Sequence, residues 1–149
     1  MHMHTYTLLM STPVANVCNC FAARKAARFI TQIYERHLQK AGITGSQYTI
    51  LTVVRSRPGI SMLELAEELG MDRTSLVRAL KPLYREAYIV DAPSETDSRK
   101  MLLTLSRAGI TKFEESDPHW RAAQQEWNNK VGSERAKALR EELISLTET

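Results

Sequence analysis

The sequence lacks the features that mark several large classes of protein. Only two of its 149 residues are cysteines, so we expect no disulfide framework. Its longest apolar stretches, such as residues 48–54, fall far short of the ~20 residues that cross a bilayer, so we expect no membrane span. A glycine-rich phosphate loop, a nucleophile elbow and a His-Glu-x-x-His motif are all missing. We therefore expect neither an enzyme nor a bound metal or other cofactor.

The amino terminus also offers little. Residues 1–10 have no basic leader and no apolar core, so we expect no secretion signal and a cytoplasmic protein. We expect residues 1–12 to form a disordered tail. The length, the 43% hydrophobic content and the formal net charge of +3 fit one compact domain with an appended helical region. The positive net charge permits a polyanionic partner but does not identify one.

Two helix-start signals lie between residues 60 and 87. Ser61 and Glu64 have the spacing of a capping box, and Asp72 can accept a hydrogen bond from an amide in the turn that follows it. Gly70, between the two predicted helices, suits a left-handed turn. The spacing predicts a helix-turn-helix.

The second predicted helix has an apolar stripe and a cationic face. The stripe expected to face the core consists of Leu76, Val77, Leu80, Leu83 and Tyr84. The opposite face carries Thr74, Arg78, Lys81 and Arg85, with Arg73 at the amino end. A merely solvated face is the alternative reading of such a row. Pro82 predicts a kink or an end near Leu80, which leaves residues 73–81 to read a DNA groove.

A predicted β-hairpin follows this helix. Residues 88–91 and 101–105 are β-prone, and the polar, turn-rich segment between them holds Arg99 and Lys100. A basic hairpin beside a recognition helix reaches the adjacent DNA backbone or minor groove. The hairpin therefore favours one interpretation of the cationic row, a winged helix-turn-helix that binds double-stranded DNA. It argues against the alternative, a row that is only solvated.

Long helices are predicted on both sides of this region. The first spans about residues 14–39 and ends at Gly42. The next begins near Thr44, where Gln47 completes a capping box, and ends before Pro58.

Two more helices follow the hairpin. Ser106 caps one that Pro118 should bend, and the last begins near residue 134. One face of this last helix carries Leu139, Leu143 and Leu146. The terminal helices have more apolar surface than one chain can cover, so we expect a homodimer, with a monomer as the alternative.

These features together resemble the MarR family of bacterial transcription regulators. The resemblance is carried by the helix-turn-helix, by G-I-T-G-S-Q-Y at residues 42–48 and by D-S-R-K-M-L-L-T-L-S-R-A-G at residues 97–109. It implies a mainly α fold with a small β wing in one domain, residues 13–147. Dimerisation helices at 13–43 and 107–147 would flank a winged helix-turn-helix at 44–106. Ser98 and Asp91 depart from the family, which often has basic residues at both positions.

The family resemblance implies a function and a set of site residues. It implies a repressor that a small aromatic or phenolic effector releases from a pseudo-palindromic operator, although a winged helix can also activate. In the wing, Asp97 would orient Arg99. The DNA-binding residues would be Arg73, Thr74, Ser75, Arg78, Lys81, Arg85, Asp97, Arg99 and Lys100. The effector cleft would be lined by Arg24, Arg28, Tyr34, His37 and Tyr48.

Cys18 and Cys20 suggest an alternative function. Cys20-Phe21, with Tyr34 fourteen residues after Cys20, resembles the organic hydroperoxide regulators of the same family, although Arg24 and Gly45 replace tyrosines of that branch. Arg24 would favour a thiolate at Cys20. The alternative is thus a repressor that senses organic peroxides through Cys20. On a helix the side chains of Cys18 and Cys20 diverge, which argues against a shared metal site, and His2 and His4 lie in the predicted tail.

Overall fold

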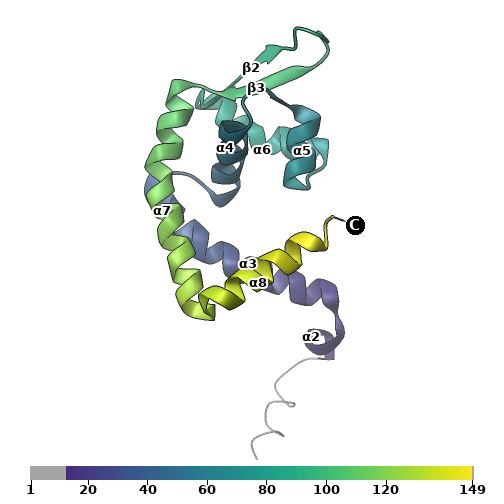
Figure 1. Cartoon of the computed structure of the whole chain (residues 1–149), viewed down its shortest axis with the longest axis vertical. Coiled ribbons are helices and arrows are strands. Elements are labelled where there is room, and N and C mark those ends of the chain that lie inside the picture. Colours follow the sequence, from purple (N-terminus) through teal and green to yellow (C-terminus); the bar gives the residue numbers. More distant parts are fainter. Residues whose placement is uncertain (1–12, 149) are drawn as a thin grey trace, which may run out of the picture.

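The computed structural model describes residues 13–148, so the predicted tail at residues 1–12, with His2 and His4, lies outside the described residues. Along the chain the elements are α2 (Pro13–Val17), α3 (Asn19–Leu38), the 3-10 turn η1 (Gln39–Ala41), α4 (Gly45–Ser56), β1 (Ile60–Ser61), α5 (Met62–Leu69), α6 (Arg73–Arg85), β2 (Ile89–Pro93), β3 (Met101–Leu105), α7 (Arg107–Val131) and α8 (Ser133–Ser145). This is the predicted mainly helical fold with a small β wing. Figure 1 shows α7 running from the wing to the end of the molecule that holds α3 and α8.

Both predicted capping boxes are present. The hydroxyls of Thr44 and Ser61 accept hydrogen bonds from the amides three residues later, at 3.1 and 3.2 Å. Gln47 and Glu64 accept from the amides of Thr44 and Ser61 in return, at 3.0 and 3.2 Å. Each box satisfies backbone donors that the first helical turn leaves unpaired, which fixes where α4 and α5 begin.

The predicted helix-turn-helix is confirmed. Gly70 ends α5 in the left-handed region at φ 64°, and Asp72 accepts a hydrogen bond from the amide of Ser75 at 2.7 Å to start α6. The core under these helices is formed by side chains from α4, α5, α6 and the sheet. Its fully buried members include Leu51, Val54, Leu65, Leu76, Leu80, Leu83, Ile89 and Leu103.

The wing is part of a three-stranded antiparallel sheet in the order β1-β3-β2. Strands β2 and β3 pair from Ile89 with Leu105 to Pro93 with Met101, which confirms the predicted hairpin. Strand β1 pairs Ile60 with Leu103. A strand of two residues shows no alternation, so the sequence pattern did not reveal β1.

The prediction of one continuous first helix is wrong. Cys18 separates α2 from α3 with an extended backbone at φ −94° and ψ 111°. Its Sγ accepts a hydrogen bond from the amide of Phe21 at 3.3 Å, so the thiol caps α3. Gly42 follows η1 in the left-handed region, as predicted for the end of this segment.

The predictions for α6 need two corrections. Of the two predicted outcomes near Leu80, a kink or an end, the end is wrong, because the helix continues through Pro82 to Arg85. Proline removes one backbone hydrogen bond, and the buried side chains of Leu80 and Leu83 hold the helix against the core on either side. Val77 and Tyr84 do not belong to the buried stripe, because 42% and 37% of their surface is exposed.

Helix α7 starts in close contact with the strand region. The hydroxyl of Ser106 accepts a hydrogen bond from the amide of Gly109 at 3.0 Å, which is the predicted cap. A Cβ atom at Gly109 would overlap the carbonyl oxygen of Tyr88, so only glycine allows this approach. The helix continues through Pro118 to Val131. The base of the wing and the start of α7 are therefore tightly packed together.

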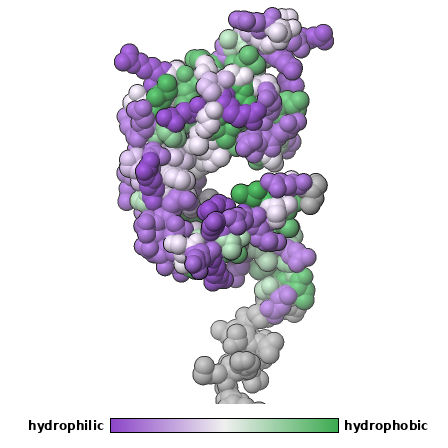
Figure 2. Space-filling view, in the orientation of Figure 1, coloured by the Kyte–Doolittle hydropathy of each residue, from purple (hydrophilic) through white to green (hydrophobic). Residues whose placement is uncertain are grey.

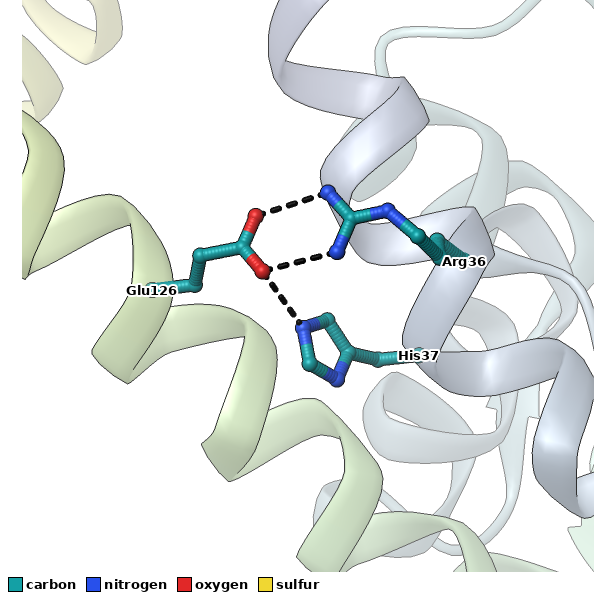
Figure 3. Close-up of polar contacts among 3 residues, drawn as sticks. All are labelled: Arg36, His37 and Glu126. Carbon is teal, nitrogen blue, oxygen red and sulfur yellow. Dashed lines mark hydrogen bonds and ion pairs between the residues drawn. The ribbon is translucent and has the colours of Figure 1, made fainter.

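An ion-pair cluster joins α3 to α7 (Figure 3). Nη1 and Nη2 of Arg36 both donate to the Glu126 carboxylate at 2.7 Å, and Nε2 of His37 lies 3.1 Å from Oε1 of the same group. Hydrogen bonds from Arg36 and then from His37 lower the pKa of Glu126 to about 2. The cluster links the last turns of α3 to α7 at the surface of the molecule.

The terminal helices leave apolar side chains exposed. Exposed fractions are 39% for Leu139, 54% for Leu143, 63% for Leu146 and 79% for Val17. Figure 2 shows hydrophobic surface at the free end of α8 and around α2. No helix among residues 13–148 is long and apolar enough to cross a membrane.

Candidate functional site

The outer face of α6 forms a shallow, cationic concavity. Its volume is about 320 Å³, and it is lined by Arg73, Thr74, Val77, Arg78 and Lys81. The four polar side chains of this set are exposed, in the places that the helical periodicity predicted. Arg85 is also exposed in the last turn of α6 but does not line the concavity. Val77 is an apolar member that the sequence had assigned to the core.

Ser75, another of the predicted DNA-binding residues, contacts the start of α6. Its amide and its hydroxyl both donate to the Asp72 carboxylate, at 2.7 and 3.1 Å. These bonds, together with the charge of Arg78, lower the pKa of Asp72. The side chain of Ser75 therefore completes the helix cap, and in this arrangement its hydroxyl proton is not directed outward.

At the wing tip, Asp97 shapes the backbone. Its Oδ1 accepts a hydrogen bond from the amide of Arg99 at 3.0 Å, and its carbonyl oxygen accepts one from the amide of Lys100 at 3.0 Å. The guanidinium is held only loosely, with Nε 3.9 Å from Oδ1 and 95% of the side chain exposed. The carboxylate thus sets the turn from which Arg99 projects, rather than the direction of the guanidinium itself.

A hydrogen bond that the sequence analysis missed links α6 to the wing. The hydroxyl of Tyr84 donates to Oδ2 of Asp91 in β2 at 3.3 Å. Burial and the neighbouring carboxylate raise the pKa of Tyr84 to about 12. The sequence had marked Asp91 only as a departure from the family, and no spacing rule pairs a helix residue with this strand position.

A second concavity, of about 410 Å³, lies where α3, α4 and α7 meet. It is lined by Ile30, Thr31, Tyr34, Glu35, Leu38, Gly45, Ser46, Tyr48, Thr49 and Trp120, and we call it the cleft. Two of the residues predicted to line an effector cleft, Tyr34 and Tyr48, are among these residues. Arg24 and Arg28 are exposed on earlier turns of α3 and do not line it, and His37 turns away from it toward Glu126. These three residues therefore stay a prediction for an effector site that a second copy would help to form.

One wall of the cleft is an aromatic stack. The Tyr48 ring lies between Phe113 and Trp120, with centroid distances of 5.6 and 5.9 Å. Its hydroxyl donates to Asp117 at 3.0 Å. Burial, together with this carboxylate, raises the pKa of Tyr48 to about 12. The phenol therefore stays protonated as a fixed part of the wall.

The lining also includes the carboxylate of Glu35 in α3, which lies at the start of α4. The amide of Gly45 donates to Oε1 of Glu35 at 2.8 Å. A Cβ atom at Gly45 would lie 2.8 Å from the same oxygen, so a larger residue would push the carboxylate aside. The sequence analysis noted Gly45 only as a departure from the peroxide-sensing branch and missed its contact with Glu35.

The cysteines lie apart from the cleft. Cys18 is half-buried and Cys20 is exposed. Tyr34 follows Cys20 by fourteen residues on α3, which is about 21 Å along a helix, so the two cannot touch within one chain. The hydroxyl of Tyr34 donates instead to Gln124 of α7. Within residues 13–148 no three His, Cys, Asp or Glu side chains form a group that could hold a metal ion.

Comparison with known proteins decides the family. The pattern of the MarR family matches residues 41–100. The chain is 30% identical to the Mycobacterium tuberculosis transcriptional regulator MosR, solved in complex with DNA, over 88% of this chain and 94% of that chain, with a TM-score of 0.78. The chain belongs to the MarR family.

Two further relatives of this MarR-family chain are known as transcriptional regulators. A regulatory protein for the hcr operon of Thauera aromatica is 33% identical over 60% of this chain and 49% of the relative. The organic hydroperoxide resistance transcriptional regulator of Bacillus subtilis is 29% identical over 60% of this chain and 61% of the relative. The match thus spans less than two thirds of each relative. The relatives bear names of regulators and not of enzymes, in line with the prediction.

Proposed function

We propose that this MarR-family protein is a transcriptional repressor that binds DNA as a homodimer and is released from the DNA when it binds a small molecule. The observation that carries the proposal is the outward cationic face of α6. Arg73, Arg78 and Lys81 surround a concavity of about 320 Å³. A major groove admits one α-helix, and a face of this kind suits insertion into it.

The proposed contacts of α6 with DNA are of two kinds, contacts with base edges and contacts with phosphates. Arg73 and Arg78 have the bidentate geometry that recognises guanine, and the methyl groups of Val77 and Thr74 suit the thymine methyl. Lys81 and Arg85 would neutralise phosphates. In the wing, the extended side chain of Arg99, with Lys100, would reach the neighbouring backbone or minor groove. Asp97 contributes by shaping the turn.

The proposed dimer uses the terminal helices. Leu139, Leu143 and Leu146 would be covered by a second copy, since exposed leucines at this density favour association. We therefore retain the division into dimerisation helices at 13–43 and 107–147 around a winged region at 44–106. A two-fold axis would present two α6 helices to half-sites of a pseudo-palindrome.

The proposed effector site is the cleft. It lies between the terminal helices α3 and α7 and the first helix of the winged region, α4. A molecule bound there with different affinities in the DNA-bound and released forms would shift the population between them.

Gel-shift titration with DNA from upstream of the gene tests the DNA-binding proposal. Arg78→Ala should weaken operator binding by ~1–3 kcal/mol and relax specificity, whereas Lys100→Ala should weaken all DNA sequences alike. Arg135→Ala, which removes an exposed arginine from α8, is the matched control and should change little. Unchanged binding by Arg78→Ala would contradict the placement of α6 in the groove.

The second candidate function is peroxide sensing through Cys20. It is supported by the exposure of Cys20 and by the likeness to the B. subtilis regulator, although Tyr34 of the same chain is too distant to assist. Treatment with cumene hydroperoxide should oxidise Cys20 and release the operator, and Cys20→Ser should abolish the release while Cys18→Ser should retain it. A free Cys20 thiol after treatment, measured by mass spectrometry, would exclude this function.

A further inference from the structure

The first turn of α4 is where an anionic ligand would be expected to bind. Its unpaired amides and the positive end of the helix dipole attract negative charge. In this protein the position is already filled, because the Glu35 carboxylate accepts the amide of Gly45 at 2.8 Å. Gly45 has no side chain to obstruct it. An anion entering the cleft would meet a negative charge in place of free amides.

The rest of the lining does not compensate that charge. Among the described residues that line the cleft, none is lysine, arginine or histidine. Arg121 lies nearby but pairs with Asp117 at 2.7 Å. Arg140 of α8 does not line the cleft, but its charge acts on Tyr34, where it opposes the rise in pKa that burial causes. The charge at the wall itself is therefore negative.

The aromatic groups of the cleft favour a flat, positively charged guest. Tyr34, Tyr48 and Trp120 each line it. The faces of the Tyr48 ring are covered by Phe113 and Trp120, so the rings that can attract a cation through a face are those of Tyr34 and Trp120. The hydroxyl protons of Tyr34 and Tyr48 are already donated to Gln124 and Asp117. The oxygens of these phenols can still accept hydrogen bonds, so they also favour a ligand that donates hydrogen bonds.

We infer that the cleft takes a planar aromatic cation, held between the rings and the Glu35 carboxylate, and discriminates against aromatic carboxylates. This inference rests on the proposed effector role of the cleft. It assigns a positive charge to the small aromatic effector that the family resemblance implies. A neutral aromatic amide should rank between the two.

Three probes of nearly equal shape test the charge preference in the full-length protein. Benzamidine is cationic, benzamide is neutral and benzoate is anionic, and their affinities can be compared by calorimetry and by thermal shift. The expected order of affinity is benzamidine, benzamide, benzoate, with about tenfold between the first and the last. An order with benzoate first, or no binding of benzamidine at millimolar concentration, would overturn the inference.

Glu35→Gln locates the effect. The glutamine oxygen can still accept the Gly45 amide, so the fold is retained while the charge is lost. The variant should bind benzamidine about tenfold more weakly and benzoate more tightly than the parent. Glu114→Gln removes an exposed carboxylate on α7 outside the cleft and should leave the probe order intact. Equal effects of the two variants would show a general charge effect and overturn the assignment.

The gel shift separates this inference from the proposed function. Benzamidine binding that depends on Glu35, in a protein that fails to retard DNA, would support the ligand class and contradict the regulator. DNA binding by a protein that prefers benzoate would support the regulator and contradict the ligand class.

Discussion

Most leucines of residues 44–106 are buried or half-buried within the chain, whereas those at the C-terminal end, in and just after α8, are exposed. Leu51, Leu65 and Leu80 are at most 1% exposed, but Leu143 of α8 and Leu146, which follows α8, are 54% and 63% exposed. The two regions differ in the neighbours that one chain supplies. The winged region is thus expected to be stable by itself, and the terminal helices to depend on a second copy.

The largest expected effect breaks the core of the winged region. Leu80→Ala creates a cavity in a fully buried site and should lower the free energy of unfolding by about 2–5 kcal/mol. Leu63→Ala removes the same atoms from a side chain that is 67% exposed, so it should change this free energy by no more than about 0.5 kcal/mol. Urea titration followed by circular dichroism measures both. Equal losses would refute the contrast between buried and exposed sites.

A second substitution tests the joint between the two regions. Gly109→Ala places a methyl group against the carbonyl oxygen of Tyr88, and the forced separation should cost about 1–3 kcal/mol of unfolding free energy. Thr111→Ala, at an exposed position in the same turn of α7, is the control. If Gly109→Ala were as stable as the parent, α7 and the strand region would not be as tightly packed as described.

Truncation of the apolar face of α8 should affect assembly rather than folding. Leu143→Ala should raise the dimer dissociation constant about tenfold, because a buried leucine contributes on the order of 1.5 kcal/mol or more to association. Analytical ultracentrifugation measures the dimer dissociation constant of this variant and of Leu63→Ala, which removes the same atoms from a position outside α8. A parent protein that stays monomeric at micromolar concentration would contradict the proposed role of α8.

The smallest expected effect concerns acid. The pKa of Glu126 is lowered from an ordinary 4.5 to about 2 by Arg36 and His37. A depressed folded-state pKa stabilises the fold at pH values above 4.5, and this contribution is lost as the pH falls from 4.5 toward 2. Glu126→Gln should flatten the pH dependence of unfolding in that window, and Glu114→Gln should preserve it. Identical pH profiles for all three proteins would mean that the α3–α7 ion pair is not formed in solution.

The sequence predicted the elements whose signals are local. Capping residues such as Ser61 and the left-handed Gly70 act within a few residues of themselves, so the helix-turn-helix could be located without coordinates. The hairpin was equally accessible, because its β-prone runs flank a turn-rich segment. The proposed DNA-facing residues of α6 followed from the same helical periodicity.

Contacts between distant residues could not be predicted in this way. Glu35 with Gly45, Tyr84 with Asp91 and Arg36 with Glu126 depend on how helices cross, which no spacing encodes. Local rules also failed where packing or an unusual cap prevailed. The buried leucines of α6 carry the helix past Pro82, and a cysteine at residue 18 begins a helix where serine or aspartate is more usual.

The length of α7 gives the packing at Gly109 a mechanical meaning. Twenty-five residues make a rod of about 37 Å. If the rod is gripped firmly at the wing, a tilt of about 5° imposed near α8 displaces its other end by about 3 Å, a large fraction of the rise of one helical turn. Small rearrangements where two copies meet would then produce a larger change in the distance between their two β-hairpins.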